Sequence, residues 1–185
     1  MRSPPSLIFL SGKKRAGKDT FAQQLMKRYA YHRIAFADVL KDEVAAKWNL
    51  NREEFDLDTH KETKPPGFAY TRRQLCQIHG REKRQMDPEY WIHKGQEQIN
   101  ARLAKGELVV VTDARFPNEL APSHYATEDM CTVRIERPNR ADDLKADRDI
   151  TETALDAWPF DVQLIHEEGN AETLCTQFET YLHST

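Results

Sequence analysis

Two glycines and a lysine near the start of the chain have the spacing of a phosphate-binding loop. Gly12, Gly17 and Lys18 fit the pattern G-x-x-x-x-G-K, in which glycines let backbone N–H groups turn toward an anion and the lysine adds a full positive charge. This pattern predicts a site for nucleotide phosphates, with Lys18 on the β- and γ-phosphates. The alternative is an ordinary turn whose glycines serve only the backbone. The residues expected to line the site are Gly12, Lys13, Lys14, Arg15, Ala16, Gly17, Lys18, Asp19 and Thr20.

Oxygen ligands for a metal ion are expected beside this loop. Asp19 stands where Ser or Thr normally meets Mg²⁺, and Thr20 follows it. Asp113 follows the apolar run 108–111, which reads as a buried strand. We predict that Asp19, Thr20 and Asp113 hold Mg²⁺ or its waters, and that Arg115 binds a phosphate through two N–H groups. The alternative for Asp113 is that it only starts a turn.

Further basic residues could bind an anionic second substrate. Lys41 lies one turn into an expected helix that follows Asp38. A basic cluster comes later in the chain, and the alternative for every member is a solvated helix face. Trp91 or Tyr90 is a candidate to stack on a base, although a long helix more often buries such aromatics. The cluster consists of Arg72, Arg73, Arg81, Lys83 and Arg84.

The elements that must position these residues follow one another as strands and helices. Expected strands cover residues 7–10, 32–38, 108–113, 131–136 and 160–165, and expected helices cover residues 17–29, 39–48, 52–55, 70–80, 89–103 and 171–182. The first helix should carry Phe21, Leu25 and Met26 on one side, and Asp38 is a candidate N-cap. Alternating strands and helices predict an α/β domain with a parallel sheet. We expect strand 7–10 at its centre and ligands at the carboxyl ends of the strands.

Composition favours a single domain in the cytoplasm. A length of 185 residues suits one domain, 1–185, and a net charge of −3 provides no basic field for nucleic acid. The three cysteines have no metal-ligand spacing and suit a reducing compartment. No apolar run has the length of a signal peptide or a membrane span. We therefore expect no nucleic-acid or membrane partner, and either a monomer or a homodimer.

Two polar segments are expected to serve the site from outside the sheet. Residues 49–105 hold a polar excursion and the basic helices, and we interpret them as an acceptor-binding helical region. Residues 141–149 carry six charges and cannot be core. They form either a solvated loop or part of a lid over residues 137–152. In the lid interpretation, Arg137, Arg140 and Arg148 reach the transferring phosphate.

Several motifs together resemble the P-loop nucleoside monophosphate kinase-like family, above all its bacteriophage-type deoxynucleoside monophosphate kinases. The acid in Gly-Lys-Asp19-Thr is the most diagnostic, because in that family Asp takes the usual hydroxyl position. Asp149 departs from the family, which tends to have His there, and this weakens a lid role for that position. The other shared motifs are Ala-Asp38-Val-Leu-Lys41, Arg72-Arg-Gln-Leu-Cys-Gln-Ile-His-Gly80, Asp87-Pro-Glu-Tyr-Trp91, Thr-Asp113-Ala-Arg115-Phe-Pro-Asn-Glu119, Glu-Arg137-Pro and Asp147-Arg-Asp-Ile-Thr-Glu152.

The animal-type phosphomevalonate kinases are similar to nearly the same degree. They share the Gly-Lys-Asp loop, the Leu-Lys-Asp/Glu helix start and a segment like residues 80–88. Against this family, Asp113-Ala-Arg115-Phe116 lacks the second adjacent arginine that those enzymes tend to have. The Arg-Pro step after the fourth strand and the Ile-Thr-Glu step also favour the nucleotide enzymes.

The resemblance implies a three-layer P-loop kinase fold, with about five parallel strands, helices on both faces and a small lid. It implies transfer from ATP, with Mg²⁺, to the 5′-phosphate of a (deoxy)nucleoside monophosphate or, in the alternative, to 5-phosphomevalonate. The implied catalytic residues are Lys18, Asp19, Asp113, Arg115 and Arg148. Arg137 and Arg140 join the loop in binding the donor. The implied acceptor-binding residues are Asp38, Lys41, Arg72, Arg73, Arg84, Trp91, Arg115 and Glu152.

A nucleotide-dependent regulatory protein is a third possibility. A GTPase would carry an Asn-Lys-x-Asp motif and a strand-end Asp-x-x-Gly, and neither occurs in the chain. Asp113 is followed by Ala-Arg-Phe instead. The many arginines also suit an anionic second substrate better than a switch.

Overall fold

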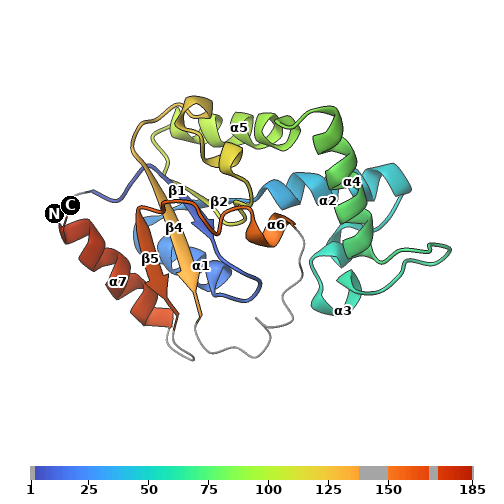
Figure 1. Cartoon of the computed structure of the whole chain (residues 1–185), viewed down its shortest axis with the longest axis horizontal. Coiled ribbons are helices and arrows are strands. Elements are labelled where there is room, and N and C mark those ends of the chain that lie inside the picture. Colours follow the sequence, from blue (N-terminus) through green and yellow to red (C-terminus); the bar gives the residue numbers. More distant parts are fainter. Residues whose placement is uncertain (1–2, 138–149, 167–170, 185) are drawn as a thin grey trace. The chain divides into compact units, whose positions relative to one another are not determined.

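The computed structural model of the chain describes residues 3–137, 150–166 and 171–184. Within them, five strands form one parallel sheet with the order β2-β3-β1-β4-β5 (Figure 1). The strands are β1 Leu7–Ser11, β2 His32–Ile34, β3 Val109–Val111, β4 Met130–Glu136 and β5 Val162–Ile165. The predicted α/β class, the five parallel strands and the central place of the first strand are confirmed.

Helices connect these strands, as the sequence pattern predicts. The longer ones are α1 Lys18–Tyr29, α2 Phe36–Trp48, α4 Arg72–Met86, α5 Tyr90–Leu103 and α7 Ala171–Ser184. The shorter ones are η1 Arg52–Phe55, α3 Asp58–Lys61, η2 Pro117–Leu120, η3 Pro122–His124 and α6 Ile150–Thr153. None of the helices in the described part of the chain is long and apolar enough to cross a membrane.

The chain divides into two compact units. Unit 1 comprises Met1–Ala35 and Gln96–Thr185, and unit 2 comprises Phe36–Gly95. Unit 1 contains the sheet, and unit 2 contains α2, η1, α3 and α4. The expected acceptor-binding region, 49–105, falls mostly in unit 2. The single-domain description of residues 1–185 stays a prediction.

The core of unit 1 forms because the central strands are apolar on both faces. Helices α1 and α7 lie side by side over one face (Figure 1), where the rings of Phe21 and Phe178 meet edge to face with centroids 5.5 Å apart. Since side chains alternate along a strand, Phe9 points to the other face. Its ring centroid lies 5.1 Å from that of Tyr125. Both faces of β1 are therefore buried.

The core of unit 2 is smaller and is built by its helices and the segment between them. Val44, Ala45, Phe55 and Leu75 form a buried cluster. Helix α4 starts at a capping box, in which the Thr71 side chain accepts from the backbone N–H of Gln74 and the Gln74 side chain accepts from that of Thr71. The cap fixes where the basic helix begins.

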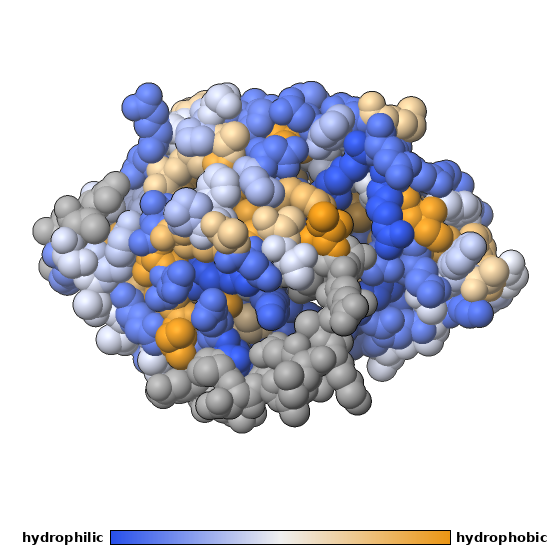
Figure 2. Space-filling model, in the orientation of Figure 1, coloured by the Kyte–Doolittle hydropathy of each residue, from blue (hydrophilic) through white to orange (hydrophobic). Residues whose placement is uncertain are grey.

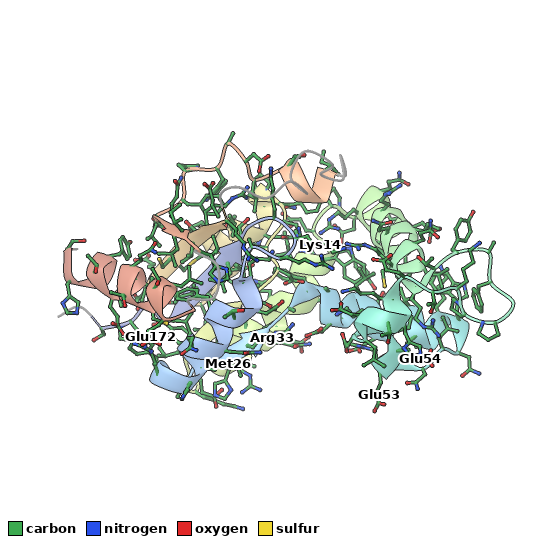
Figure 3. The ribbon with its side chains drawn as sticks, turned by 90° about the horizontal axis from the view of Figure 1, so that it is seen from below. Lys14, Met26, Arg33, Glu53, Glu54 and Glu172 are labelled. Atoms are coloured by element: carbon green, nitrogen blue, oxygen red, sulfur yellow. The ribbon has the colours of Figure 1, made fainter. Side chains whose placement is uncertain are left out.

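Three expected details are wrong. Met26 is 41% exposed and does not share the buried side of α1 with Phe21 and Leu25 (Figure 3). The buried stripe of α1 runs through Phe21, Ala22 and Leu25. Strand β2 ends at Ile34, so Asp38 lies in the first turn of α2 and is not its N-cap.

Helix α2 starts at Phe36, three residues before the expected start at residue 39, and the Phe36 ring packs against α5. A Cβ placed on Gly95 would lie 2.4 Å from the Phe36 ring, so this glycine of α5 makes room for the first side chain of α2. Helix α4 also continues past residue 80 to Met86, since its charged residues are good helix formers on an exposed face.

Candidate functional site

The loop between β1 and α1 has the backbone that a phosphate-binding loop needs. Gly12 and Gly17 have φ angles of +149° and +111°, and Arg15 is also left-handed with φ of +62°. A Cβ on Gly12 would lie 2.4 Å from the carbonyl oxygen of Ile135 in β4. Both glycines are therefore required by conformation, and Gly12 also by the close approach of β4.

Lys18 folds back over this loop. Its Nζ donates to the carbonyl oxygens of Gly12 at 2.6 Å and Lys13 at 2.9 Å. The ammonium group therefore lies against the loop backbone at the N-terminus of α1, where an anion is favoured by the helix dipole. Lys14 and Arg15 are exposed on the same loop, and Figure 3 labels Lys14 there.

The predicted metal ligands follow two neighbouring strands. Asp19 and Thr20 lie in the first turn of α1, directly after the loop. Asp113 follows β3, which pairs with β1 in parallel, with Phe9 opposite Val111. Asp19 is exposed, and Thr20 and Asp113 are half-buried. Asp19 and Thr20 therefore follow β1, and Asp113 follows the neighbouring β3, at the carboxyl end of the sheet.

These oxygen donors fit Mg²⁺ better than a metal ion whose ligands all come from the protein. Carboxylate and hydroxyl oxygens are hard ligands, and Mg²⁺ usually combines one or two carboxylates with waters and substrate phosphates. Over the described ranges, no group of three or more His, Cys, Asp or Glu residues is placed to hold an ion. The oxygens of Asp19, Thr20 and Asp113 would supply the protein share of such a site.

Glu119 organises the turn that carries Asp113 and Arg115. It is only 2% exposed, and its Oε2 accepts from the backbone N–H of Arg115 at 2.6 Å and of Phe116 at 3.1 Å. The Tyr125 hydroxyl donates to the Glu119 carbonyl oxygen at 2.7 Å. The sequence alone assigns no role to Glu119. The available signal was an acidic residue four positions after Arg115 and two after Pro117.

Arg134 is a second residue that sequence reasoning missed. It lies in β4 opposite Ser11, the last residue of β1, and is buried. Its guanidinium donates to Ser11 Oγ at 3.2 Å and to an Asp156 carboxylate oxygen at 2.7 Å. A lone arginine inside an apolar strand was the available signal. The contact joins the segment after α6 to the strand that leads into the loop.

Lys41 and Arg52 form a charge network in unit 2. Lys41 Nζ lies 2.7 Å from Asp56 Oδ1 and 3.5 Å from Asp38 Oδ1. Arg52 binds Asp42 and Asp56, and reaches Asp38 at 3.6 Å. Burial raises the pKa of the Asp56 carboxyl, but the hydrogen bonds from Lys41 and Arg52 outweigh it, so that pKa is lowered. The predicted residues Asp38 and Lys41 are therefore brought together.

The two adjacent arginines at the start of α4 have different environments. Arg72 is buried and binds the Glu54 carboxylate, the Thr63 hydroxyl at 3.0 Å and backbone carbonyls of the same segment. Its Nε is buried without a hydrogen-bond partner in the described part of the chain. Arg73 is half-buried and paired with Glu62 at 2.6 Å. Arg84, further along α4, is half-buried.

Trp91 lies inside unit 2. It is 3% exposed, and its Nε1–H donates to the Gly80 carbonyl oxygen at 3.3 Å. Trp91 is therefore buried, which is the alternative to stacking on a base. Tyr90 is half-buried, and its hydroxyl donates to Glu43 at 2.7 Å.

The remaining predicted residues lie at or beyond the edges of the described ranges. Arg137 directly follows β4 and is half-buried. Arg140, Arg148 and the departure at Asp149 lie outside the described residues, as does most of the predicted lid 137–152. Glu152 lies in α6.

Several solved structures share this fold. The chain matches TT1252 from Thermus thermophilus with a TM-score of 0.55 and 14% identity, covering 98% of each chain. It matches dephospho-CoA kinase from Campylobacter jejuni with a TM-score of 0.53 and 12% identity, covering 96% of each chain. A sugar kinase from Janibacter sp. HTCC2649 gives a TM-score of 0.53 and 14% identity, covering 97% of this chain and 95% of that one. At such identities the likeness is one of fold, and it confirms the predicted P-loop kinase fold.

Sequence comparisons match the chain to two kinds of kinase. A deoxynucleotide monophosphate kinase from Enterobacteria phage T4 is 40% identical over 68 residues, which cover 31% of this chain and 28% of that protein. The chain therefore spans well under half the length of this relative. Residues 10–128, more than half of the chain, match the family described as phosphomevalonate kinase. On that match, the chain belongs to the phosphomevalonate kinase family.

Proposed function

We propose that the chain is an ATP-dependent small-molecule kinase that transfers the γ-phosphoryl group to the 5′-phosphate of a (deoxy)nucleoside monophosphate. The loop from Gly12 to Thr20, with the Lys18 ammonium against its backbone, is the observation that carries the donor half of this proposal. The phage relative, named a deoxynucleotide monophosphate kinase, supports the acceptor half.

Catalysis in this proposal is mainly positioning and charge neutralisation, because two polyanions must approach each other. The loop N–H groups and Lys18 hold the donor phosphates. When bound, Mg²⁺ would supply positive charge against the donor phosphates. Asp19, Thr20 and Asp113 provide oxygens for it or for its waters, and Arg115 holds a phosphate oxygen.

The acceptor phosphate is assigned to basic residues of unit 2. Lys41 and Arg73 are partly exposed cations, each paired with a carboxylate that a phosphate can replace. Arg72 is held more firmly. We therefore assign it a structural role in this region in addition to any direct contact with the acceptor. No general base is needed, because the attacking phosphate oxygen is already ionised. Arg137, Arg140 and Arg148 are proposed to meet the transferring group.

Phosphomevalonate is the second candidate acceptor. The match of residues 10–128 to the phosphomevalonate kinase family is the specific observation that favours it. Both acceptors present a phosphate monoester to the same cations, so the donor half of the proposal is common to both. A cytoplasmic monomer or homodimer suits either activity. Cys76, Cys131 and Cys175, all among the described residues, form no disulfide.

The test is an acceptor screen that measures ADP release. The purified chain is given ATP and Mg²⁺ with each of the four dNMPs, the four NMPs and 5-phosphomevalonate. Stimulation by one or more monophosphates is the expected result. Stimulation by phosphomevalonate alone selects the second candidate, and tight ATP binding without stimulation by any acceptor selects a regulatory protein.

A matched pair of lysine variants on α1 checks the donor site. Lys18→Ala should lower kcat at least about 100-fold, because it removes a cation from the transferring phosphates. Lys27→Ala removes an exposed lysine from the same helix and should leave kcat within about twofold. Full activity in the Lys18 variant would contradict the assignment of the loop.

A further inference from the structure

His166 packs directly on the phosphate-binding loop, although it comes 150 residues later in the chain. Its Nδ1 lies 2.9 Å from the carbonyl oxygen of Ala16. The ring also lies against Gly17, since a Cβ on this glycine would be 2.4 Å from Nδ1 and 2.9 Å from Cε1. The side chain thus touches the peptide between Ala16 and Gly17 from one side.

Three elements of unit 1 hold His166 in this place. It follows β5, and its backbone N–H donates to the Glu136 carbonyl oxygen at the end of β4 at 2.7 Å. The preceding residue, Ile165, is bound at both polar groups by Gln177 of α7. Its N–H donates to Gln177 Oε1 at 2.8 Å, and its carbonyl accepts from Gln177 Nε2 at 2.9 Å. An edge strand is therefore fixed just before the histidine.

The hydrogen bond determines both the tautomer and the orientation of the loop peptide. A carbonyl oxygen only accepts, so Nδ1 of His166 carries the hydrogen. The C=O and N–H of a trans peptide point in opposite directions. With the Ala16 carbonyl held toward the ring, the N–H of Gly17 points away from it.

We propose that His166 is a positioning residue for the phosphate-binding loop. By holding the Ala16 carbonyl, it keeps the Gly17 N–H directed at the donor phosphate and removes the freedom of this peptide to flip. Gly17 is then required twice, once by its φ of +111° and once by the ring beside it. The inference rests on the ATP site of the proposed function and on neither proposed acceptor.

The test compares three variants of His166 by ATP affinity. Asn places an amide N–H where Nδ1 lies, Gln places it one bond further along, and Ala removes it. We expect His166→Ala and His166→Gln to weaken ATP binding about tenfold, because each loses the hydrogen bond that orients the loop peptide. His166→Asn should stay within about twofold of wild type. His183→Ala, an exposed histidine on α7, is the matched control and should change nothing.

Steady-state kinetics and NMR add measurements that would not change if His166 had a purely structural role. In His166→Ala, KM for ATP should rise while KM for the acceptor stays unchanged. The side-chain ¹⁵N spectrum of the wild type should show hydrogen on Nδ1, which is the minor tautomer of free histidine. Equal ATP affinities for the Asn, Gln and Ala variants would overturn the inference, and so would hydrogen on Nε2 alone.

Failure of the inference can be told apart from failure of the proposed function. If the wild type binds ATP and His166→Ala binds it equally well, the positioning role is wrong and the kinase proposal stands. If the wild type binds no ATP, the donor site itself is wrong. If His166→Ala does not fold, the comparison of the Asn and Gln variants still decides.

Discussion

At the scale of single residues, the glycines of the chain separate into those that need space and those that need only backbone freedom. Gly17 has φ of +111° and the His166 ring where a Cβ would stand. Gly106 has φ of +71° and nothing within 4 Å of its Cβ position. Both conformations are costly for any other residue. Only the first lies in the proposed ATP site.

This pair predicts different outcomes for the same substitution. Gly106→Ala should lower the free energy of unfolding by about 1 kcal/mol through backbone strain and leave ATP binding unchanged. Gly17→Ala should weaken ATP binding more than tenfold, because the loop must move away from His166. Thermal melting and ATP titration measure the two effects. Wild-type ATP affinity in Gly17→Ala would contradict the described loop.

At the scale of elements, one carboxylate joins α2, α4 and the first turn of α5 within unit 2. Glu43 on α2 accepts from the Tyr90 hydroxyl of α5 at 2.7 Å and meets His79 Nε2 of α4 at 3.1 Å. Burial raises the pKa of Glu43, but the hydrogen bonds from Tyr90 and His79 outweigh it and hold that pKa below its usual 4.5. The hydrogen bond to Glu43 raises the pKa of Tyr90 to about 12.

The lowered pKa of Glu43 predicts how stability depends on pH. In acid the unfolded chain takes up a proton at the usual pKa before the folded chain does, so this stability is present above pH 4.5 and is lost as pH falls below it. Glu43→Gln should reduce the loss of Tm between about pH 5 and about pH 3. Glu53→Gln, at an exposed glutamate (Figure 3), is the control. An unchanged pH dependence in Glu43→Gln would refute the role of this carboxylate.

Adjacent arginines at the start of α4 separate structural support from substrate contact. Arg72 joins α4 to the segment 54–63 through a buried ion pair and the Thr63 hydroxyl. Arg72→Ala should cost on the order of 3 kcal/mol, because a partly buried carboxylate loses its partner. Arg73→Ala should cost little stability, since its partner Glu62 is exposed. It should instead raise KM for the acceptor about tenfold. Equal melting temperatures of the two variants would contradict this division.

At the scale of the whole molecule, the proposed donor and acceptor residues belong to different compact units. Unit 1 holds the loop, Asp113, Arg115 and His166, and unit 2 holds Lys41 and the basic helix α4. On the face shown in Figure 2, apolar residues lie in scattered spots between hydrophilic ones.

Hydrogen exchange should report the two halves of the reaction separately. ATP with Mg²⁺ should slow amide exchange in residues 12–20, because the loop N–H groups gain acceptors. The acceptor should slow exchange in unit 2, within α2 and the first turns of α4. Lys18→Ala should lose most of the first effect and keep the second. Acceptor protection confined to unit 1 would remove the acceptor role from Lys41 and Arg73.

Local pattern was enough to predict the sheet and the loop. The apolar runs at β1, β3 and β4 and the spacing of Gly12, Gly17 and Lys18 depend on neighbours in the sequence, so they can be read without a structure. The end of β2 could not be read in this way. Helix α2 starts two residues after it, at Phe36, whose ring packs against Gly95 almost 60 residues later, and a contact over that distance leaves no local pattern.

The sequence by itself therefore determined the α/β class, the place of the phosphate-binding loop and the residues available for a kinase site. Tertiary structure alone decided how those residues are used. It buried Arg72 and Trp91, made Glu119 the anchor of the Arg115 turn, and brought His166 against Gly17. The physical reason is that burial and hydrogen bonding depend on contacts between residues far apart in the chain, and these contacts leave no local pattern.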